Sequence, residues 1–124
     1  MIGYVMVGTN DMPKAAAFYD ALLAEIGAQR LMEDERFIAW ANDPQKPGFC
    51  IARPFNGEAA SAGNGSMIAL AVETPEQVQA LHAKALSLGA TDEGAPGPRG
   101  EGSFYGGYFR DLDGNKLNFF CFVK

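Results

Sequence analysis

Histidine, tryptophan and cysteine are scarce in this chain of 124 residues, which contains one His, one Trp and two Cys. His82 adjoins Leu81 at the edge of an apolar helical stripe, a boundary position that favours a structural role over catalysis. Cys50 and Cys121 both lie inside strand-like apolar runs, and no export signal precedes them. We therefore expect two buried free thiols rather than a disulfide or a metal site.

Blocks of like charge and long apolar runs are also absent. The net charge of −5 is spread along the chain, which argues against a nucleic-acid partner because phosphate binding needs clustered Lys and Arg. The start of the chain has neither the basic region nor the apolar run of a signal peptide. No apolar run approaches the roughly 20 residues that span a bilayer. These absences predict a cytoplasmic protein without a membrane partner.

The composition that remains is typical of a globular domain, with 48% hydrophobic and 20% charged residues. The strongest local signal lies near the end of the chain. Asp113-Gly114 separates two runs rich in aromatic residues, 108–110 and 117–123, and this pattern predicts a β-hairpin. Asp111 and Asp113 are explained better by this turn than by an acid–base pair, because Asp is favoured in turns.

Two helices are predicted, each with its own start and stop signals. Asp11 can cap the first helix, and Thr74 and Gln77 form a capping box for the second. Glycine ends both helices, and apolar residues recur at helical spacing within them. The strands expected around them are residues 2–8, 29–33, 36–41, 49–53 and 67–72, a short edge strand within 91–101, and the two hairpin strands.

The two halves of the chain repeat one pattern. Three pairs of residues are each 62 positions apart: Pro13 and Pro75, Gly27 and Gly89, and Ala28 and Ala90. Self-similarity at a fixed offset indicates two copies of one βαβββ module. The sequence thus predicts an α+β fold in which two βαβββ modules form curved mixed sheets around a cleft. We expect one domain over 1–124, with module one at about 1–54, a linker at about 55–65 and module two at about 66–124.

Three stretches resemble the vicinal oxygen chelate superfamily, which includes glyoxalase I, extradiol dioxygenases, fosfomycin-resistance transferases and bleomycin-resistance proteins. They are residues 10–19, 67–72 and 109–115. The third is similar to the superfamily's Asp-Pro-Asp-Gly-Asn hairpin, with Leu112 in place of proline. The resemblance implies the paired-module fold and a homodimer. It says little about which reaction or ligand is involved.

The resemblance also implies a divalent metal in the cleft, bound by His, Glu or occasionally Tyr from the first and last strands of each module. The corresponding positions here are Tyr4, Met67 and Asn118, and residues 49–53 contain no Glu or His. Thioether, amide and phenol groups without a neighbouring carboxylate suit such ions poorly. We therefore predict no cofactor, with a divalent metal at a non-standard site as the alternative.

Strand alternation then indicates which side chains share the cleft. A three-residue hairpin loop would set Tyr108 opposite Asn118 and Arg110 opposite Lys116, whereas a two-residue loop would shift the pairing by one. The predicted ligand-binding residues are Tyr4, Trp40, Arg53, Met67, Tyr108, Asn118 and Phe120. Such an aromatic lining with a few polar tips suits a small planar ligand.

Three functions remain open at this point. The first is a metal-free protein of the glyoxalase/bleomycin-resistance type that binds a small aromatic or planar molecule. The second is an enzyme with an altered site, namely a glyoxalase-like lyase, an isomerase or a dioxygenase. Tyr4 or Tyr108 would be its acid–base candidate, although a tyrosine with its usual pKa of about 10 is a weak base at neutral pH. The third is an interaction module without a small-molecule ligand.

Overall fold

A computed structural model describes residues 1–123 of the chain. The elements are β1 (Tyr4–Gly8), α1 (Met12–Ala24), β2 (Gln29–Glu33), β3 (Phe37–Ala41), β4 (Gly48–Ala52), β5 (Ile68–Ala71), α2 (Pro75–Ser87), β6 (Thr91–Pro98), β7 (Phe104–Arg110) and β8 (Lys116–Phe122). They fall into two compact units, module one (Met1–Ala62) and module two (Gly63–Lys124). The predicted βαβββ repeat is therefore confirmed, and the boundary between the units lies inside the predicted linker.

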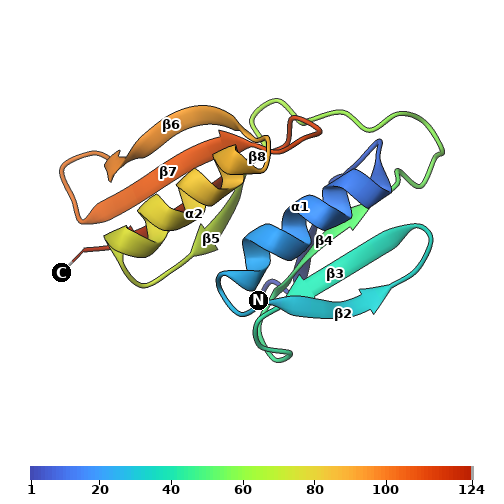
Figure 1. The fold of residues 1–124 in the computed structure, drawn as a ribbon, viewed down its shortest axis with the longest axis horizontal. Helices are drawn as coiled ribbons and strands as arrows, with labels where there is room; N and C mark the ends of the chain where they lie inside the picture. The colour runs from blue at the N-terminus through green and yellow to red at the C-terminus, as the bar shows by residue number, and fades with distance from the viewer. Residues whose placement is uncertain (124) are drawn as a thin grey trace. The chain divides into compact units, whose positions relative to one another are not determined.

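Each module contains one four-stranded mixed sheet (Figure 1). The strand order is β1-β4-β3-β2 in module one and β5-β8-β7-β6 in module two, so the two modules have the same topology. The first strand of each module pairs parallel to the last, and the other pairs are antiparallel. Neither sheet closes on itself. The α+β class is confirmed, while the cleft between the modules stays a prediction.

The helix ends follow the predicted signals. The Asp11 carboxylate accepts a hydrogen bond from the backbone N–H of Lys14, and Thr74 and Gln77 form both bonds of a capping box. Gly27 and Gly89, with φ angles of 75° and 107°, take the left-handed conformation that favours glycine after a helix. Among the described residues, neither helix is long and apolar enough to cross a membrane.

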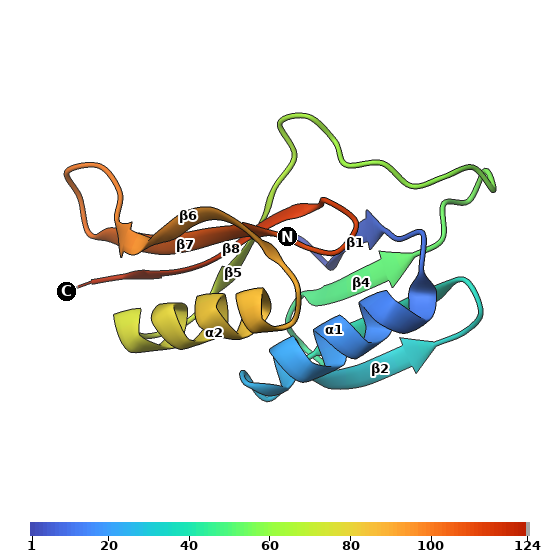
Figure 2. The same ribbon diagram turned by 45° about the horizontal axis from the view of Figure 1, so that its top comes forward.

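Each helix covers one face of its own sheet, and the core of each module lies in that layer. In Figure 2, α2 runs along one face of the sheet formed by β5 to β8. In module one, Tyr19 of α1 packs against Trp40 and Phe49, with ring centroids 5.8 and 4.6 Å away. In module two, Phe109 and Phe119 stack at 5.8 Å, and both are fully buried. Aromatic packing of this kind contributes strongly to core stability.

Strand β6 departs from the sequence prediction, since it covers eight residues where only a short edge strand was expected. Its Gly- and Pro-rich sequence is typical of a loop, but pairing with β7 holds it in the sheet with register shifts next to Gly94. The strand lies at the sheet edge. Proline has no backbone N–H to donate, and an edge strand tolerates Pro96 and Pro98 because it has a neighbouring strand on one side only. Tertiary pairing thus overrides the local loop signal.

Candidate functional site

Each sheet has a second face that the helix of its own module does not cover, and we call this the open face. In module one, Tyr4 and Met6 point to the open face and are 67% and 43% exposed, whereas Val5 and Val7 between them are partly buried. This alternation agrees with the prediction that Tyr4 and Met6 share one face. The predicted ligand-binding residues can therefore be assigned to an open face or a helix face.

The open face of module one contains a groove of about 370 Å³, which is large enough for a small ligand. We call it the module-one groove. Its lining consists of Gly3, Tyr4, Met6, Leu31, Met32, Arg36, Phe37, Ala39, Pro44, Lys46, Gly48 and Cys50. Met6, Cys50 and Ala39 lie side by side across β1, β4 and β3, as the strand register shows. The groove is thus apolar in its centre, with a phenol and two cations at its margin.

Cys50 is a buried free thiol, as predicted, and it lies in the groove lining. Burial raises the pKa of this thiol above its ordinary value, because a thiolate would lose solvation there. Cys50 therefore acts as an apolar wall at neutral pH rather than as a nucleophile.

Trp40 does not belong to the open face, so its predicted position in the lining of the cleft is wrong. On β3, Phe37 and Ala39 face the groove. Trp40 follows Ala39, so its ring points to the opposite face of the sheet, toward α1. The ring is 1% exposed, packs against Tyr19, and its Nε1–H donates to Oδ1 of Asp20 at 2.9 Å. Trp40 is a core residue, because the register of β3 turns its side chain to the helix.

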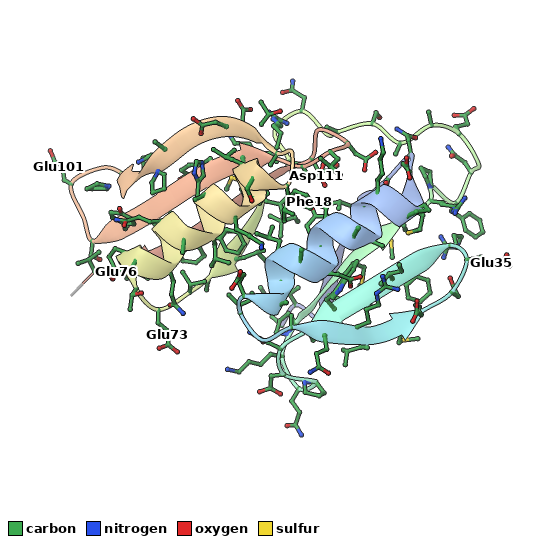
Figure 3. All side chains as sticks on the ribbon, viewed as in Figure 1. Phe18, Glu35, Glu73, Glu76, Glu101 and Asp111 are labelled. Carbon is green, nitrogen blue, oxygen red and sulfur yellow. The ribbon has the colours of Figure 1, made fainter. Side chains whose placement is uncertain are left out.

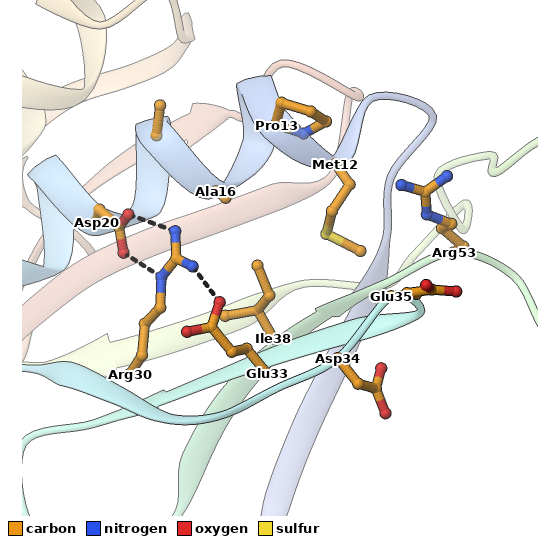
Figure 4. Close-up of a pocket in the computed structure, with 11 residues that line it drawn as sticks. Met12, Pro13, Ala16, Asp20, Arg30, Glu33, Asp34, Glu35, Ile38 and Arg53 are labelled. Carbon is orange, nitrogen blue, oxygen red and sulfur yellow. Dashed lines mark hydrogen bonds and ion pairs between the residues drawn. The ribbon is translucent and has the colours of Figure 1, made fainter.

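Arg53 is also on the helix side, which contradicts its predicted place in the ligand-binding lining. It directly follows β4 and is two residues after Ile51. Side chains at alternate positions share a face, so Arg53 lies on the same side as Phe49 and Ile51, which pack in the core. Figure 4 shows it at one end of a second hollow of about 370 Å³, next to α1. At the opposite end Arg30 donates to the carboxylates of Asp20 and Glu33.

The hairpin of module two has the predicted register. Tyr108 pairs with Asn118 and Arg110 with Lys116, which confirms the pairing expected for the three-residue loop. The Asp111 carboxylate accepts backbone N–H groups of Asp113 and Asn115, both at 2.9 Å, so the acidic residues serve the turn as expected. The pairing sets Tyr108 and Asn118 side by side on the open face.

The open face of module two is aromatic. Phe120 stacks on Phe104 with centroids 5.3 Å apart, and Phe122 meets both rings edge-on. Ala69 of β5 pairs with Asn118, and by alternation Met67 falls on the same face. Four predicted residues therefore share this face, namely Met67, Tyr108, Asn118 and Phe120. Their role in ligand binding stays a prediction.

Asn118 is the unusual member of this face. Its side chain is 0% exposed, and neither its amide nitrogen nor its amide oxygen has a hydrogen-bond partner within the described residues. Gly106 lies next to it, and a Cβ there would meet the Phe104 ring at 2.9 Å and the Asn118 nitrogen at 3.4 Å. The absence of a side chain at Gly106 thus lets an aromatic ring and a polar amide lie over the same strand.

Cations flank the neighbouring tyrosine. The guanidinium carbon of Arg99 and the ammonium nitrogen of Lys116 lie 5.3 and 5.6 Å from the centroid of the Tyr108 ring. Arg99 is held there by donating to the carbonyl oxygens of Ala95 and Gly97. The open face of module two therefore combines aromatic rings, one buried amide and positive charge.

A model of the glyoxalase/bleomycin resistance protein/dioxygenase superfamily matches residues 1–119 of the chain. The chain belongs to this superfamily. A crystal structure of a glyoxalase/bleomycin resistance protein from Albidiferax ferrireducens is similar over 99% of both chains, with 37% identity and a TM-score of 0.90. A comparison with curated proteins found no matching relative.

More distant members of the superfamily share the fold. An enzyme of this family from Burkholderia phytofirmans is 20% identical over 98% of both chains, with a TM-score of 0.76. Lactoylglutathione lyase from Agrobacterium tumefaciens is 15% identical over 98% of this chain and 92% of its own, with a TM-score of 0.72. These two similarities support the fold alone.

The residues at the superfamily's metal positions do not fit a divalent ion. Module two contributes the thioether of Met67 and the amide of Asn118, and module one contributes the phenol of Tyr4. Hard or borderline divalent ions prefer carboxylate and imidazole ligands, which this set lacks. Among residues 1–123, no three His, Cys, Asp or Glu side chains are grouped so that they could bind a metal. No step of a reaction is therefore assigned to a metal here.

His82 is more deeply buried than the boundary position predicted for it, with 5% exposure. Its Nε2 lies 3.1 Å from both Oδ1 of Asp92 and the carbonyl oxygen of Tyr108. Both partners are acceptors, so Nε2 carries a proton and donates to them. His82 thus ties α2 to β6 and β7 on the helix face, away from the open face, as a structural role requires.

Sequence reasoning missed most of the module-one groove. Leu31 and Met32 both line it although they are consecutive, because the register of β2 shifts between Arg30 and Met32. Simple alternation would have placed one of them on the other face. Phe37 and Ala39 alternate along β3 and so share one face, which strand alternation could have indicated. The same alternation places Trp40 on the other face, outside the groove.

Proposed function

We propose that this protein binds a small aromatic or otherwise planar molecule on its open faces, without the divalent metal that the superfamily's enzymes use. The observation that carries the proposal is the buried Asn118 amide with two unpartnered polar atoms. Leaving such a group without partners costs about 1–3 kcal/mol, so native proteins usually satisfy it. A ligand with a donor and an acceptor would satisfy both amide atoms if neighbouring side chains such as Phe104 and Tyr108 moved aside, because Asn118 is fully buried without a ligand.

The surroundings of Asn118 support a planar ligand. Phe104, Phe120 and Tyr108 present aromatic rings around the amide, and Ala69 on its other side is small. Ring stacking provides affinity, and a few placed polar groups provide orientation, which is the usual division of roles in small-molecule sites. The apolar module-one groove offers a second surface of the same character.

A thermal-shift screen tests the proposal with planar aromatic compounds that bear adjacent donor and acceptor groups. Compounds that raise the melting temperature of the wild type should lose this effect in Asn118→Leu, because leucine cannot form hydrogen bonds. Asn64→Leu, in an exposed loop, is the matched control and should respond like the wild type. Binding that is equal in wild type and Asn118→Leu would contradict the role of the amide.

Elemental analysis of protein purified without chelator tests the metal-free part of the proposal. We expect no stoichiometric transition metal, and about one ion per chain would overturn this part. Catalytic turnover of a bound compound, lost in Tyr4→Phe or Tyr108→Phe, would instead favour the enzyme alternative.

The cytoplasmic location stays a prediction. We also infer that two chains form a homodimer. Large apolar side chains on the open faces are strongly exposed, including Tyr4, Met32, Met67 and Phe122. Large exposed apolar side chains on a sheet face are typical of interaction sites. Native mass spectrometry at micromolar concentration should show a dimer, and a purely monomeric spectrum would contradict the inference.

A further inference from the structure

We propose that the ligand of the open faces is an organic anion, namely a carboxylate, phosphate or sulfonate attached to an aromatic or apolar body. This inference rests on the function proposed above and adds the charge of the ligand. It comes from the distribution of unpaired positive charge over the two open faces.

The module-one groove has two cationic side chains in its lining, Arg36 and Lys46, and no acidic one. The guanidinium carbon of Arg36 lies 5.3 Å from the centroid of the Phe55 ring. Neither cation lies within ion-pair distance of a carboxylate in residues 1–123, although Arg36 is near enough to Asp34 to help lower the pKa of that carboxyl group. The margin of this apolar groove therefore carries two positive charges that can attract an anion, and of the two only Arg36 has a carboxylate, that of Asp34, in its neighbourhood.

The open face of module two repeats this arrangement with other residues. Arg99 and Lys116 both approach the Tyr108 ring, and neither has a carboxylate partner in the described part of the chain. Both side chains are only partly exposed. An anion bound near the Tyr108 ring would be attracted by both charges. Lys116 precedes Asn118 by two residues on β8, so amide and ammonium belong to the same face.

The positive charge on the open faces contrasts with the negative net charge of the whole chain. The net charge is −5, so the protein as a whole repels anions and only a local positive field can bind them. Two other arginines are neutralised, Arg110 by Glu93 and Arg30 by Asp20 and Glu33. Many acidic side chains lie at turns and helix starts, as Figure 3 shows for Glu35, Glu73, Glu76 and Glu101. A cationic ligand would meet unpaired cations on both open faces.

Two fluorescent probes with the same ring system separate charge from aromatic character. One is 8-anilinonaphthalene-1-sulfonate, and the other is N-phenyl-1-naphthylamine, which lacks the sulfonate. We expect the sulfonate to bind the wild type about tenfold more tightly at low salt, with an advantage that shrinks as sodium chloride is added. Lys46→Met and Lys116→Met should each weaken sulfonate binding by about threefold and leave binding of the neutral probe unchanged. Lys14→Met, on the exposed surface of α1, is the matched control.

The outcomes distinguish this inference from the proposed function. Equal affinity for the two probes, unaffected by salt and by both lysine substitutions, would overturn the anion inference and leave the aromatic binding function standing. Failure of both probes to bind would overturn both. Asn118→Leu should weaken both probes alike, because it removes an amide and no charge.

Discussion

The two modules share one topology, but the buried indole N–H of module one and the buried Asn118 amide of module two differ in whether they have hydrogen-bond partners. In module one, the Trp40 Nε1–H donates to Asp20, and Asp20 in turn accepts two hydrogen bonds from Arg30. In module two, Asn118 is fully buried and neither polar atom has a partner within the described residues. The same scaffold thus supports a satisfied network on a helix face and an unsatisfied amide on an open face.

The two buried polar groups have opposite effects on the stability of the free protein. A satisfied buried hydrogen bond contributes about 0.5–1.5 kcal/mol to folding, whereas an unsatisfied polar group costs about 1–3 kcal/mol. Module one therefore uses its polar group to fix the core, and module two retains one that lowers the stability of the free protein. Such a cost is typical of a site that becomes complete when a ligand binds. Three predictions test this contrast.

The largest effect is expected for Trp40→Ala in module one. The substitution removes a ring that is 1% exposed and packed against Tyr19, so it should lower the free energy of unfolding by about 3–5 kcal/mol. Urea denaturation measures this change. Met32→Ala, at a position 61% exposed, is the control and should change it by less than about 0.5 kcal/mol. A loss below 1 kcal/mol for Trp40→Ala would show that the ring is not part of the core.

An effect of opposite sign is expected for Asn118→Leu in module two. Replacing the unsatisfied amide by an apolar side chain of similar shape should raise the free energy of unfolding of the ligand-free protein by about 1–2 kcal/mol. Asn115→Leu is the matched control in the same hairpin. The Asn115 amide donates to Asp111 at 3.0 Å, so its loss should destabilise by about 1–3 kcal/mol. If both variants were destabilised equally, Asn118 would be a satisfied structural residue and the contrast would fail.

The smallest effect concerns acid stability. The hydrogen bond from Arg30, followed by that from Trp40, holds the pKa of Asp20 below its ordinary value despite partial burial. A carboxyl group whose pKa is lower in the folded state stabilises the fold above its unfolded pKa of about 4, and this stabilisation is lost as the pH falls through the folded pKa. The ion pair is 32% and 43% exposed, so solvent screening limits its contribution to about 0.5 kcal/mol.

Asp20→Asn isolates this contribution, since its amide oxygen can still accept the Trp40 bond. At pH 7 the variant should be less stable than the wild type by that small amount, and the difference should disappear as the pH falls through the lowered pKa of Asp20. Asp34 and Asp92, whose pKa values are also lowered, remain in both proteins and cancel in the comparison. A constant difference at all pH values would rule out the ionisation of Asp20 as its cause.

Much of the fold could be predicted from local signals. The caps at Asp11 and Thr74, the glycines after both helices and the offset of 62 residues predict two helices and a repeat, and the structure confirms both. The hairpin register was also predictable, because a turn type determines which residues pair. Strand β6 was not, since its Gly and Pro residues favour a loop until β7 pairs with them.

The candidate site was only partly predictable. Strand alternation indicated correctly that Tyr4 shares a face with Met6, and Tyr108 a face with Asn118. It did not orient Trp40 or Arg53, because neither β3 nor β4 has a local marker of which face meets the helix. The module-one groove depends on a β-bulge, which no sequence pattern in β2 announces.

The sequence by itself therefore determined the repeat, the helix ends, the hairpin register and the residues available at the superfamily's ligand positions. These follow from interactions between residues close together in the chain. Only the tertiary structure decided which aromatic rings became core, which face of each sheet stayed open, and that Asn118 is buried without a partner. Burial and hydrogen-bond satisfaction depend on atoms supplied by distant segments, so they appear only when the strands are paired and packed.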